Sequence, residues 1–340
     1  VVVIGYGFSG KSFHSYLVSL VDDLELYGIA SRNPETRERI VAERSCKAFA
    51  SYDDVLDDPQ VDIIVLATPN NTHADMAIAA LNKGKHLVTD KVMCLTLADC
   101  DRMIQCAKEN KRHLFVFQNR RWDGDYLTLK DAMDKGELGD VRSIEMAWQG
   151  FGAWGGWRGE KASGGGKLYD LGAHIIDQIC MLFPEPIDSV YAKLHYDLPV
   201  TDTESQAYVT INFKGGRTGI CDTSSLAAIS KPRMAAYGTK ASFIKYGLDP
   251  QEKAMIDETI DAAVEAEENY ARIHDGTVEI IRPTLAGRWR NFYENVADVI
   301  TNGAESAIQL GTNRRAMSVI DAAFRSHEEG KLIHLNYDEA

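Results

Sequence analysis

The stretch VVVIGYGFSG, residues Val1–Gly10, decides how the first part of this 340-residue chain folds. Four apolar residues, typical of a buried strand, run directly into the pattern G-x-G-x-x-G formed by Gly5, Gly7 and Gly10. Glycines at this spacing let the backbone approach a pyrophosphate, and the helix that follows offers N–H donors and a positive dipole. A tight strand–helix turn without a ligand is the alternative, but the strand–loop–helix context favours a dinucleotide-binding loop.

Outward from this loop, apolar strands and amphipathic helices alternate along the chain. Further strands are expected at residues 26–30, 62–67, 86–89 and 113–117. Helices are expected at residues 11–20, 34–44, 74–82 and 96–110. Strands separated by helices of about ten residues imply a parallel sheet with right-handed crossovers. Residues 1–118 are therefore predicted to form a dinucleotide-binding α/β domain.

The second part of the chain has a different pattern. Long strand-like stretches are expected at residues 141–151, 189–197, 207–213, 217–225 and 234–244. One helix is expected among them at 168–183, and two amphipathic helices follow at 289–301 and 312–327. Turn-like connections between the strands predict a mostly antiparallel sheet. Residues 119–340 are therefore predicted to form a second α/β domain.

Composition excludes several classes of protein. Lysine and arginine total 37 against 50 aspartates and glutamates, which gives a net charge of −13 and argues against a nucleic-acid partner. No apolar run approaches the roughly 18 residues that a membrane helix needs, and no signal peptide is visible. Six cysteines do not form a disulfide framework, so a cytoplasmic location is expected. The histidines are scattered, and no metal site is predicted.

The end of the second expected strand selects the dinucleotide. NAD sites place an acid there for the ribose 2′-hydroxyl, whereas this chain has Ser31 and Arg32, with no acid before Glu35. A guanidinium offers paired donors to phosphate oxygens, so the 2′-phosphate of NADP(H) is the better match. NADP(H) is therefore preferred, with NAD(H) as the alternative and an ordinary exposed arginine as the plain structural interpretation.

Three residues carry candidate chemistry. Lys91 follows the strand at 86–89, at the edge of the sheet where open α/β folds bind ligands. Asp170 and His174 are four residues apart on an expected helix and therefore share a face, just after the glycines at 164–166. An imidazole beside a carboxylate can take a hydroxyl proton. A solvated lysine and a surface Asp–His pair are the alternatives, and spacing alone does not join residue 91 to residue 174.

The chain resembles the Gfo/Idh/MocA oxidoreductases along nearly its whole length. The resemblance is carried by the glycine loop, Thr68-Pro69-Asn70-Asn71-Thr72-His73, Asp90-Lys91 and Asp170-Leu171-Gly172-Ala173-His174. Within the family, the branch of NADP-dependent scyllo-inositol dehydrogenases is most similar, through Gln118-Asn119-Arg120-Arg121-Trp122-Asp123, Tyr169-Asp170-Leu171 with Asp177-Gln178, and Tyr246-Gly247-Leu248-Asp249-Pro250-Gln251-Glu252.

This resemblance implies a Rossmann domain followed by an α/β domain with a large, mostly antiparallel, open-faced sheet, through which subunits form a homodimer or homotetramer. It implies hydride transfer between NADP(H) and a secondary alcohol or ketone of an inositol-like cyclic polyol or sugar. The implied catalytic residues are Lys91, Asp170 and His174, with His174 as the proton carrier. The implied cofactor-binding residues are Gly5, Tyr6, Gly7, Phe8, Gly10, Ser31, Arg32, Thr68, Pro69, Asn70, His73, Asp90, Lys91, Asn119, Trp157 and Arg158. The implied substrate-binding residues are Lys91, Arg120, Trp122, Asp170 and His174.

Two positions depart from the family pattern. Asp90 replaces a glutamate, and Val92 replaces a proline that follows the lysine, where the family's peptide bond is often cis. A non-proline cis bond costs about 2.5–4 kcal/mol, so the Lys91–Val92 bond is expected to be trans. This altered segment leaves one alternative function open, a non-catalytic NADP(H)-binding regulatory or sensor protein of the same fold.

Overall fold

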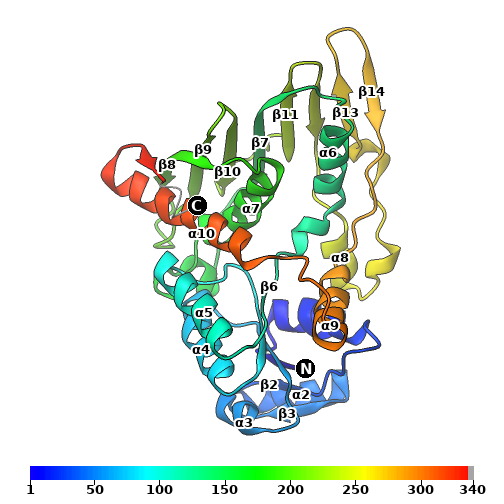
Figure 1. Ribbon diagram of the computed structural model, residues 1–340, viewed down its shortest axis with the longest axis vertical. Helices are drawn as coiled ribbons and strands as arrows, with labels where there is room; N and C mark the ends of the chain where they lie inside the picture. The colour runs from blue at the N-terminus through cyan, green and yellow to red at the C-terminus, as the bar shows by residue number, and fades with distance from the viewer. Residues whose placement is uncertain (336–340) are drawn as a thin grey trace. The chain divides into compact units, whose positions relative to one another are not determined.

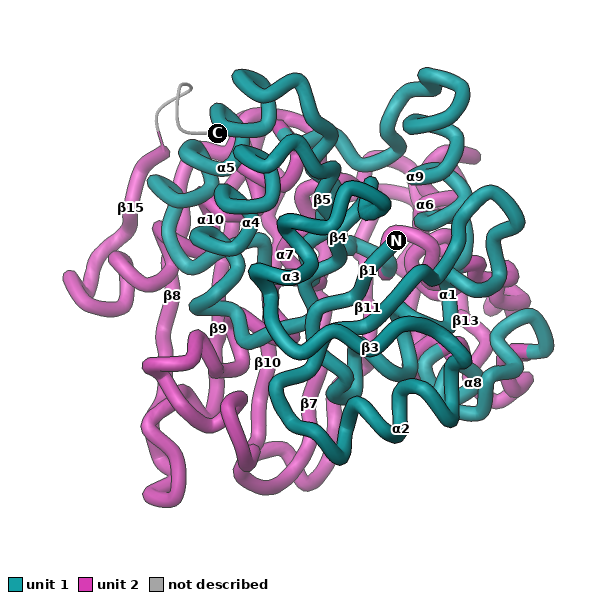
Figure 2. The backbone as a smooth tube through the Cα atoms, turned by 90° about the horizontal axis from the view of Figure 1, so that it is seen from below, with its two compact units in different colours: residues 1–119, 252–262, 289–310 teal, residues 120–251, 263–288, 311–340 magenta. Residues whose placement is uncertain are grey.

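The computed structural model describes residues 1–335, and the chain divides into two compact units. The first unit contains Val1–Asn119, Glu252–Ala262 and Trp289–Leu310. The second contains Arg120–Gln251, Ala263–Arg288 and the described residues from 311 to 335 (Figure 2). Two segments from late in the sequence therefore belong to the first unit.

Six parallel strands form the sheet of the first unit, in the order β3-β2-β1-β4-β5-β6. Figure 1 labels β2, β3 and β6 of this sheet. They are β1 (Val2–Ile4), β2 (Gly28–Ala30), β3 (Lys47–Phe49), β4 (Ile63–Leu66), β5 (His86–Thr89) and β6 (Leu114–Val116). The strand order reverses between β1 and β4, and ligands bind at the carboxyl ends of the strands beside such a reversal. The predicted parallel sheet is confirmed, and β3 is an additional edge strand that the sequence pattern did not indicate.

The helices that lie between these strands along the chain are α1 (Tyr16–Ser19), α2 (Pro34–Arg44), α3 (Tyr52–Asp57), α4 (His73–Asn82) and α5 (Leu97–Glu109). The later segments of the unit contribute α8 (Gln251–Ile256), apart from its first residue, and α9 (Asn291–Asn302). A π-helical segment, Ser9–Ser15, precedes α1. Local sequence sets where α2 begins, because the Asn33 side chain accepts a hydrogen bond from the Thr36 N–H and Pro34 occupies the first turn.

Nine strands form the sheet of the second unit, in the order β14-β13-β12-β11-β7-β10-β9-β8-β15. They are β7 (Val141–Gln149), β8 (Ile187–His195), β9 (Gln206–Phe213), β10 (Thr218–Ser224), β11 (Met234–Gly238), β12 (Ser242–Lys245), β13 (Ala271–His274), β14 (Glu279–Arg282) and β15 (Ile333–His334). Among the described strands of this sheet, only β7 and β10 pair in parallel, so the predicted mostly antiparallel sheet is confirmed. The prediction of a single strand at residues 234–244 is wrong, because the chain turns after Gly238 and β11 pairs with β12.

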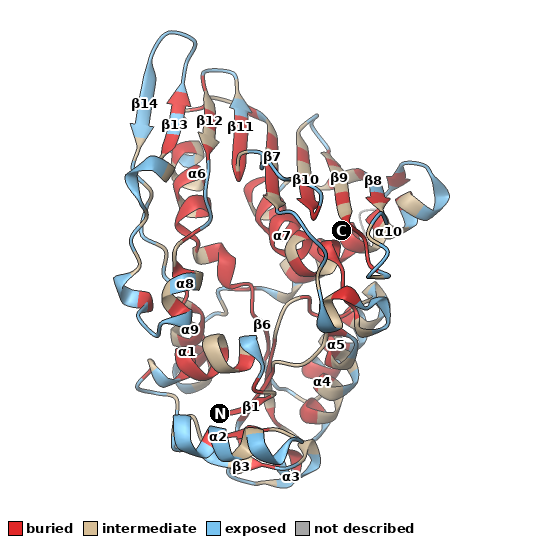
Figure 3. Cartoon of the chain, turned by 180° about the vertical axis from the view of Figure 1, so that it is seen from behind, coloured by how far each residue is buried: buried red, intermediate tan, exposed pale blue. Residues whose placement is uncertain are grey.

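Helices α6 (Gly124–Asp134), α7 (Ala173–Leu182) and α10 (Leu310–Glu329) complete the second unit. Nearly every residue of α7 is buried, and it packs against β7 and β10. A Cβ on Gly219 of β10 would lie 2.3 Å from the Ile179 side chain, so this close approach requires glycine. Buried and half-exposed residues alternate along β9, which gives the sheet one packed face (Figure 3). Within residues 1–335, no helix has the length and apolar character needed to span a bilayer.

Candidate active site

The three loop glycines have three different structural requirements. Gly5 has a φ of +100°, and a Cβ there would lie 2.4 Å from the Ala67 carbonyl oxygen. A Cβ on Gly10 would lie 2.1 Å from the Gly5 carbonyl oxygen, because the helix closes tightly on the strand end. A Cβ on Gly7, in contrast, would meet no atom within 4 Å. Gly5 and Gly10 shape the loop, and the open space at Gly7 fits the close backbone approach of a pyrophosphate.

Tyr6 and Phe8 lie differently within this loop. The buried Tyr6 donates a hydrogen bond to Glu43 Oε2 at 2.8 Å, and Lys11 forms an ion pair with the same carboxylate. These contacts lower the pKa of Glu43 to about 2, chiefly through the hydrogen bond from Lys11. Phe8 is exposed and contacts Phe13 edge to face. Phe8 is thus the member of the pair that presents an accessible surface to a ligand.

Asp90 connects the glycine-loop helix to the end of β5. Ser9 Oγ donates to Asp90 Oδ2 at 2.5 Å, the Lys91 N–H donates to Oδ1 at 2.8 Å, and His14 Nε2 lies 3.5 Å from Oδ2. Burial alone raises the pKa of Asp90, but the contacts with His14 and Ser9 and the charge of Lys91 outweigh it and lower that pKa overall. The aspartate, although shorter than glutamate, therefore holds the start of the Lys91 segment as a carboxylate.

His73 joins the loop after β4 to the segment after Lys91. Its fully buried ring places Nδ1 2.9 Å from the Val92 carbonyl oxygen and Nε2 3.0 Å from the Thr68 carbonyl oxygen. Burial lowers the pKa of His73. In its neutral form, the ring donates through one nitrogen at a time. The peptide bond between Lys91 and Val92 is cis, so the prediction of a trans bond is wrong. His73 on the Val92 carbonyl and Asp90 on the Lys91 N–H hold this conformation from both sides.

The Thr68-Pro69-Asn70 turn is closed by threonine hydroxyls. Thr68 Oγ1 and Thr72 Oγ1 are 2.7 Å apart, and the Thr72 hydroxyl donates to the Pro69 carbonyl at 2.8 Å. Asn70 is buried at the start of this turn. This turn follows β4, just as the glycine loop follows β1 and Lys91 follows β5, so the predicted cofactor residues of the first unit gather at the carboxyl edge of one sheet.

The end of β2 carries two guanidinium groups rather than one. Arg32 is exposed, as expected for a phosphate ligand. Arg37, one turn into α2, donates through Nη1 to the Ser31 carbonyl at 2.9 Å and the Arg32 carbonyl at 3.0 Å. Sequence reasoning missed Arg37, although an arginine in the first turns after a strand-end Ser-Arg pair is a usable signal. Its backbone contacts fix the turn on which Arg32 stands.

In the second unit, Asp170 and His174 are both buried. Asp170 lies on the π-helical segment Leu168–Gly172, and His174 follows in the first turn of α7. Arg158 Nε donates to Asp170 Oδ2 at 3.0 Å, and the Arg158 guanidinium also lies 4.8 Å from the Trp157 ring centroid. The helical spacing expected from the sequence thus produces a buried Asp–His pair, and Arg158 contacts its carboxylate.

Arg120, Trp148 and His174 form a stack in the same unit. The Arg120 guanidinium lies 4.3 Å from the Trp148 ring centroid, and the His174 ring stacks on Trp148 with centroids 6.1 Å apart. Gln178 donates to the Arg120 carbonyl at 2.8 Å. Arg120 therefore lies in the second unit close to His174, which is consistent with its predicted contact with substrate. The sequence did not indicate that Trp148 lies between these two side chains.

Two further predicted residues, Asn119 and Trp122, lie near Arg120 in the sequence but belong to different units. The Trp122 carbonyl accepts hydrogen bonds from Gln251 Nε2 at 3.1 Å and from the Arg288 N–H at 3.0 Å. Asn119 is buried at the end of the first stretch of the first unit. The structure thus places Lys91 and Asn119 in the first unit, and Arg120, Asp170 and His174 in the second.

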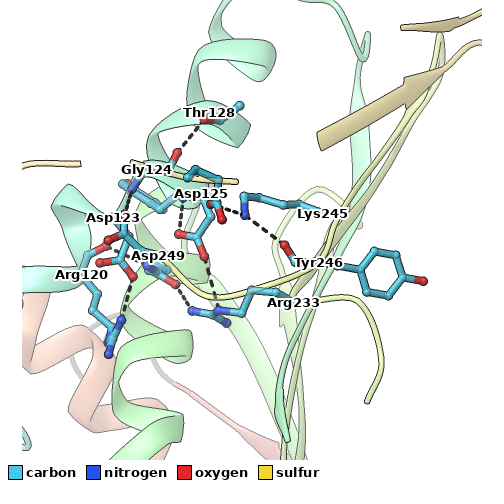
Figure 4. Close-up of polar contacts among 12 residues, drawn as sticks. Arg120, Asp123, Gly124, Asp125, Thr128, Arg233, Lys245, Tyr246 and Asp249 are labelled. Carbon is cyan, nitrogen blue, oxygen red and sulfur yellow. Dashed lines mark hydrogen bonds and ion pairs between the residues drawn. The ribbon is translucent and has the colours of Figure 1, made fainter. Parts of the chain in front are cut away.

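A buried ionic network supports the Arg120 stack (Figure 4). Arg233, whose guanidinium lies 5.3 Å from the Trp148 ring, donates to Gln178 Oε1 at 3.0 Å and lies 3.6 Å from Asp125. Asp249 accepts hydrogen bonds from the backbone at the start of α6 and at Gln251, and burial together with Asp125 raises the pKa of Asp249. These groups are far apart in the sequence, so no local pattern indicated the network.

Asp177→Asn is expected to destabilise the second unit by about 3–5 kcal/mol. Arg121 binds Asp177 through two nitrogens, at 2.8 and 2.6 Å, and both side chains are buried. The substitution leaves the Arg121 cation buried without its countercharge. Urea unfolding measures the effect, and Lys83→Met, which breaks an exposed pair with Asp57, is the matched control. Equal small shifts for both variants would contradict the prediction.

Comparisons with known proteins agree with this arrangement. Residues 1–118 match the model of an oxidoreductase family with an NAD-binding Rossmann fold, and residues 126–244 match the GFO/IDH/MocA C-terminal domain. A scyllo-inositol 2-dehydrogenase (NADP(+)) of Bacillus subtilis is 28% identical, covering 98% of this chain and 95% of the relative. A myo-inositol 2-dehydrogenase of Thermotoga maritima is 26% identical, covering 98% and 97%. A Klebsiella pneumoniae crystal structure described as an oxidoreductase has a TM-score of 0.88 at 32% identity, covering 99% and 96%.

Proposed function

Because the chain belongs to the GFO/IDH/MocA family of NAD(P)-dependent oxidoreductases, we propose that it transfers hydride between NADP(H) and a secondary alcohol or ketone of a cyclic polyol or sugar. The observation that carries the proposal is the buried Asp170–His174 pair on one helix. A buried imidazole one helical turn after a buried carboxylate suits transfer of the hydroxyl proton that accompanies hydride transfer. The similarity to the scyllo-inositol and myo-inositol 2-dehydrogenases named above supports a cyclic polyol as substrate.

The chain's own residues divide the chemistry. NADP(H), when bound, supplies the hydride acceptor or donor. His174 exchanges the proton of the reacting hydroxyl, and Asp170, held by Arg158, orients the imidazole or binds a neighbouring hydroxyl. Lys91 stabilises the negative charge that develops on the reacting oxygen, because an ammonium group favours an alkoxide where water is excluded. Gly7 leaves the space in which the pyrophosphate would lie.

Arg32→Ala is expected to raise KM for NADP(H) by about 10- to 100-fold and to change KM for NAD(H) by less than about threefold. The guanidinium would bind the 2′-phosphate, which NAD(H) lacks. Steady-state kinetics with both cofactors measure the difference. Arg102→Ala, on the exposed side of α5, is the control. Equal weakening of both cofactors, or better use of NAD(H) by the unaltered protein, would count against NADP(H) preference.

Turnover of a substrate panel tests the reaction itself. The protein is offered inositols and sugars with NADP⁺, and inososes and ketoses with NADPH, while absorbance at the NADPH band is followed. Turnover on a cyclic polyol or its ketone supports the proposal. Tight NADPH binding without turnover on any compound would overturn it in favour of a sensor.

We also propose that subunits associate through the nine-stranded sheet as a homodimer or homotetramer. Strand register places the exposed Tyr191 of β8 and Tyr237 of β11 on the same face of that sheet. Aromatic side chains of this kind are enriched at subunit interfaces. Analytical ultracentrifugation tests the proposal, and a monomer at micromolar concentration would refute it.

A further inference from the structure

The segment at residues 150–166, here called the tryptophan loop, is packed at one end and open at the other. A Cβ on Gly159, Gly165 or Gly166 would lie 2.5–2.6 Å from a backbone carbonyl or the Glu204 carboxylate. A Cβ on Gly155 or Gly156 would meet no atom within 4 Å. The second half of the loop is therefore closely packed at its glycines. The first half is held at residues 150–152 by backbone contacts with residues 224–227, but it is open around Gly155 and Gly156.

Lys167 contacts the open half of this loop through Trp154. Its Nζ lies 3.1 Å from the Trp154 ring centroid, and only 4% of the lysine is exposed. A desolvated ammonium over an indole face is the strong form of a cation–π interaction. Lys167 directly precedes the π-helical segment Leu168–Gly172, so the contact ties the open half of the loop to the helical segment that carries Asp170.

Two carboxylates surround Lys167. Asp170 faces it from its own helix, and Glu204 faces it from the connection between β8 and β9, where Glu204 also accepts the Leu168 N–H at 2.6 Å. Burial lowers the pKa of Lys167 to about 8, and the two carboxylates oppose that shift. Burial raises the pKa of Glu204, against hydrogen bonds from the backbone and the charges of Lys167 and Lys161. The ammonium form therefore prevails below about pH 8 and is lost as the pH rises through that value.

We propose that Lys167 is a positioning residue, whose ammonium group holds Trp154 and the open half of the tryptophan loop against the helix that bears Asp170 and His174. Arg158, from the same loop, makes the second link by its hydrogen bond to Asp170. Indole faces suit the C–H surfaces of a polyol ring, so an ordered loop would present Trp154 and Trp157 to the substrate. This last consequence, although not the loop contact itself, rests on the proposed function.

Limited trypsin digestion of the full chain without cofactor tests the loop contact. Cleavage after Arg158, at the end of the open half of the loop, is followed by mass spectrometry and normalised at each pH to a reporter peptide. The unaltered protein is expected to be cleaved slowly at pH 7 and at least fivefold faster at pH 9. Lys167→Met is expected to be cleaved fast at both pH values, and Lys167→Arg slowly at both, because arginine keeps its charge. Wild-type cleavage rates for Lys167→Met would overturn the proposal.

Trp154→Leu distinguishes loss of the Lys167–Trp154 contact from unfolding of the Lys167→Met variant. It removes the other partner and is expected to match Lys167→Met, and the double variant is expected to be cleaved no faster than either single variant. Additive effects in the double variant would refute a direct Lys167–Trp154 contact. Lys231→Met, outside the loop, is the control and is expected to leave cleavage after Arg158 unchanged.

Kinetics separate this proposal from the proposed function. In an active enzyme, Lys167→Met is expected to raise KM for the polyol about five- to tenfold while kcat stays within threefold, because the residue acts on the loop rather than on the reacting atoms. If no polyol is turned over but the proteolysis pattern holds, the loop contact stands and only the proposed substrate fails. A large loss of kcat with unchanged loop protection would overturn the positioning role.

Discussion

His174→Ala is expected to lower kcat by about 10²- to 10⁴-fold, the range that general acid–base catalysis contributes. The imidazole is buried, stacks on Trp148 and lies one turn after Asp170, so no water-exposed group at that position can replace it as a proton carrier. Binding of NADPH, measured by fluorescence titration, is expected to change less than about threefold, because the substitution removes a proton carrier and not a cofactor contact. His334→Ala, at the exposed residue of strand β15, is the control.

Lys91→Met tests the other half of the same machinery. Loss of the ammonium group is expected to lower kcat by about 10²- to 10³-fold, because the charge on the reacting oxygen is no longer stabilised. When two residues act as a unit in catalysis, removing both lowers kcat little more than removing one of them. The double variant Lys91→Met, His174→Ala is therefore expected to be about as slow as the worse single variant. Near-normal turnover in both single variants would contradict the assignment of Lys91 and His174 as catalytic residues.

The glycine loop provides the second large effect. Gly10→Ala is expected to destabilise the first unit by about 1–3 kcal/mol and to abolish NADPH binding, because its Cβ would lie 2.1 Å from the Gly5 carbonyl and the loop must move. For Gly7→Ala, the free energy of unfolding is expected to stay within about 1 kcal/mol of the parent value. The same variant is expected to bind NADPH at least about tenfold more weakly, because its Cβ enters the space needed by the pyrophosphate.

Thermal unfolding and NADPH titration measured on both variants separate these two requirements. The pair is matched, since each variant adds one methyl group to the same loop. Parent-like NADPH affinity in Gly7→Ala would mean that the open space at Gly7 is not the cofactor cradle. Parent-like stability in Gly10→Ala would mean that the loop tolerates a different backbone path.

Much of the first unit was predictable from local patterns. Helix α2 begins and ends at the expected residues, Pro34–Arg44, because a capping asparagine and a proline mark its start. Strand β3 and helix α6 were missed, because a three-residue edge strand and a helix whose buried face contains polar residues lack a clear apolar period. The turn that separates β11 from β12 was missed for a similar reason, since apolar residues continue on both sides of it.

The candidate site divides in the same way. The glycine spacing, the strand-end Arg32 and the Asp170–His174 pair are readable because each lies within one turn or one loop. The cis bond at Lys91–Val92 was predicted wrongly, because the contacts that hold it come from His73 as well as from Asp90. Proline chemistry alone did not indicate those contacts.

The sequence by itself determined the alternation of strands and helices, the dinucleotide loop and the residue types available for proton transfer, because all of these depend on near neighbours along the chain. Only the tertiary structure decided that Arg120 and His174 flank one tryptophan, that Arg158 binds Asp170, and that a buried lysine holds Trp154. The physical reason is that such contacts join different loops, strands and helices, and their geometry is set by how those elements pack.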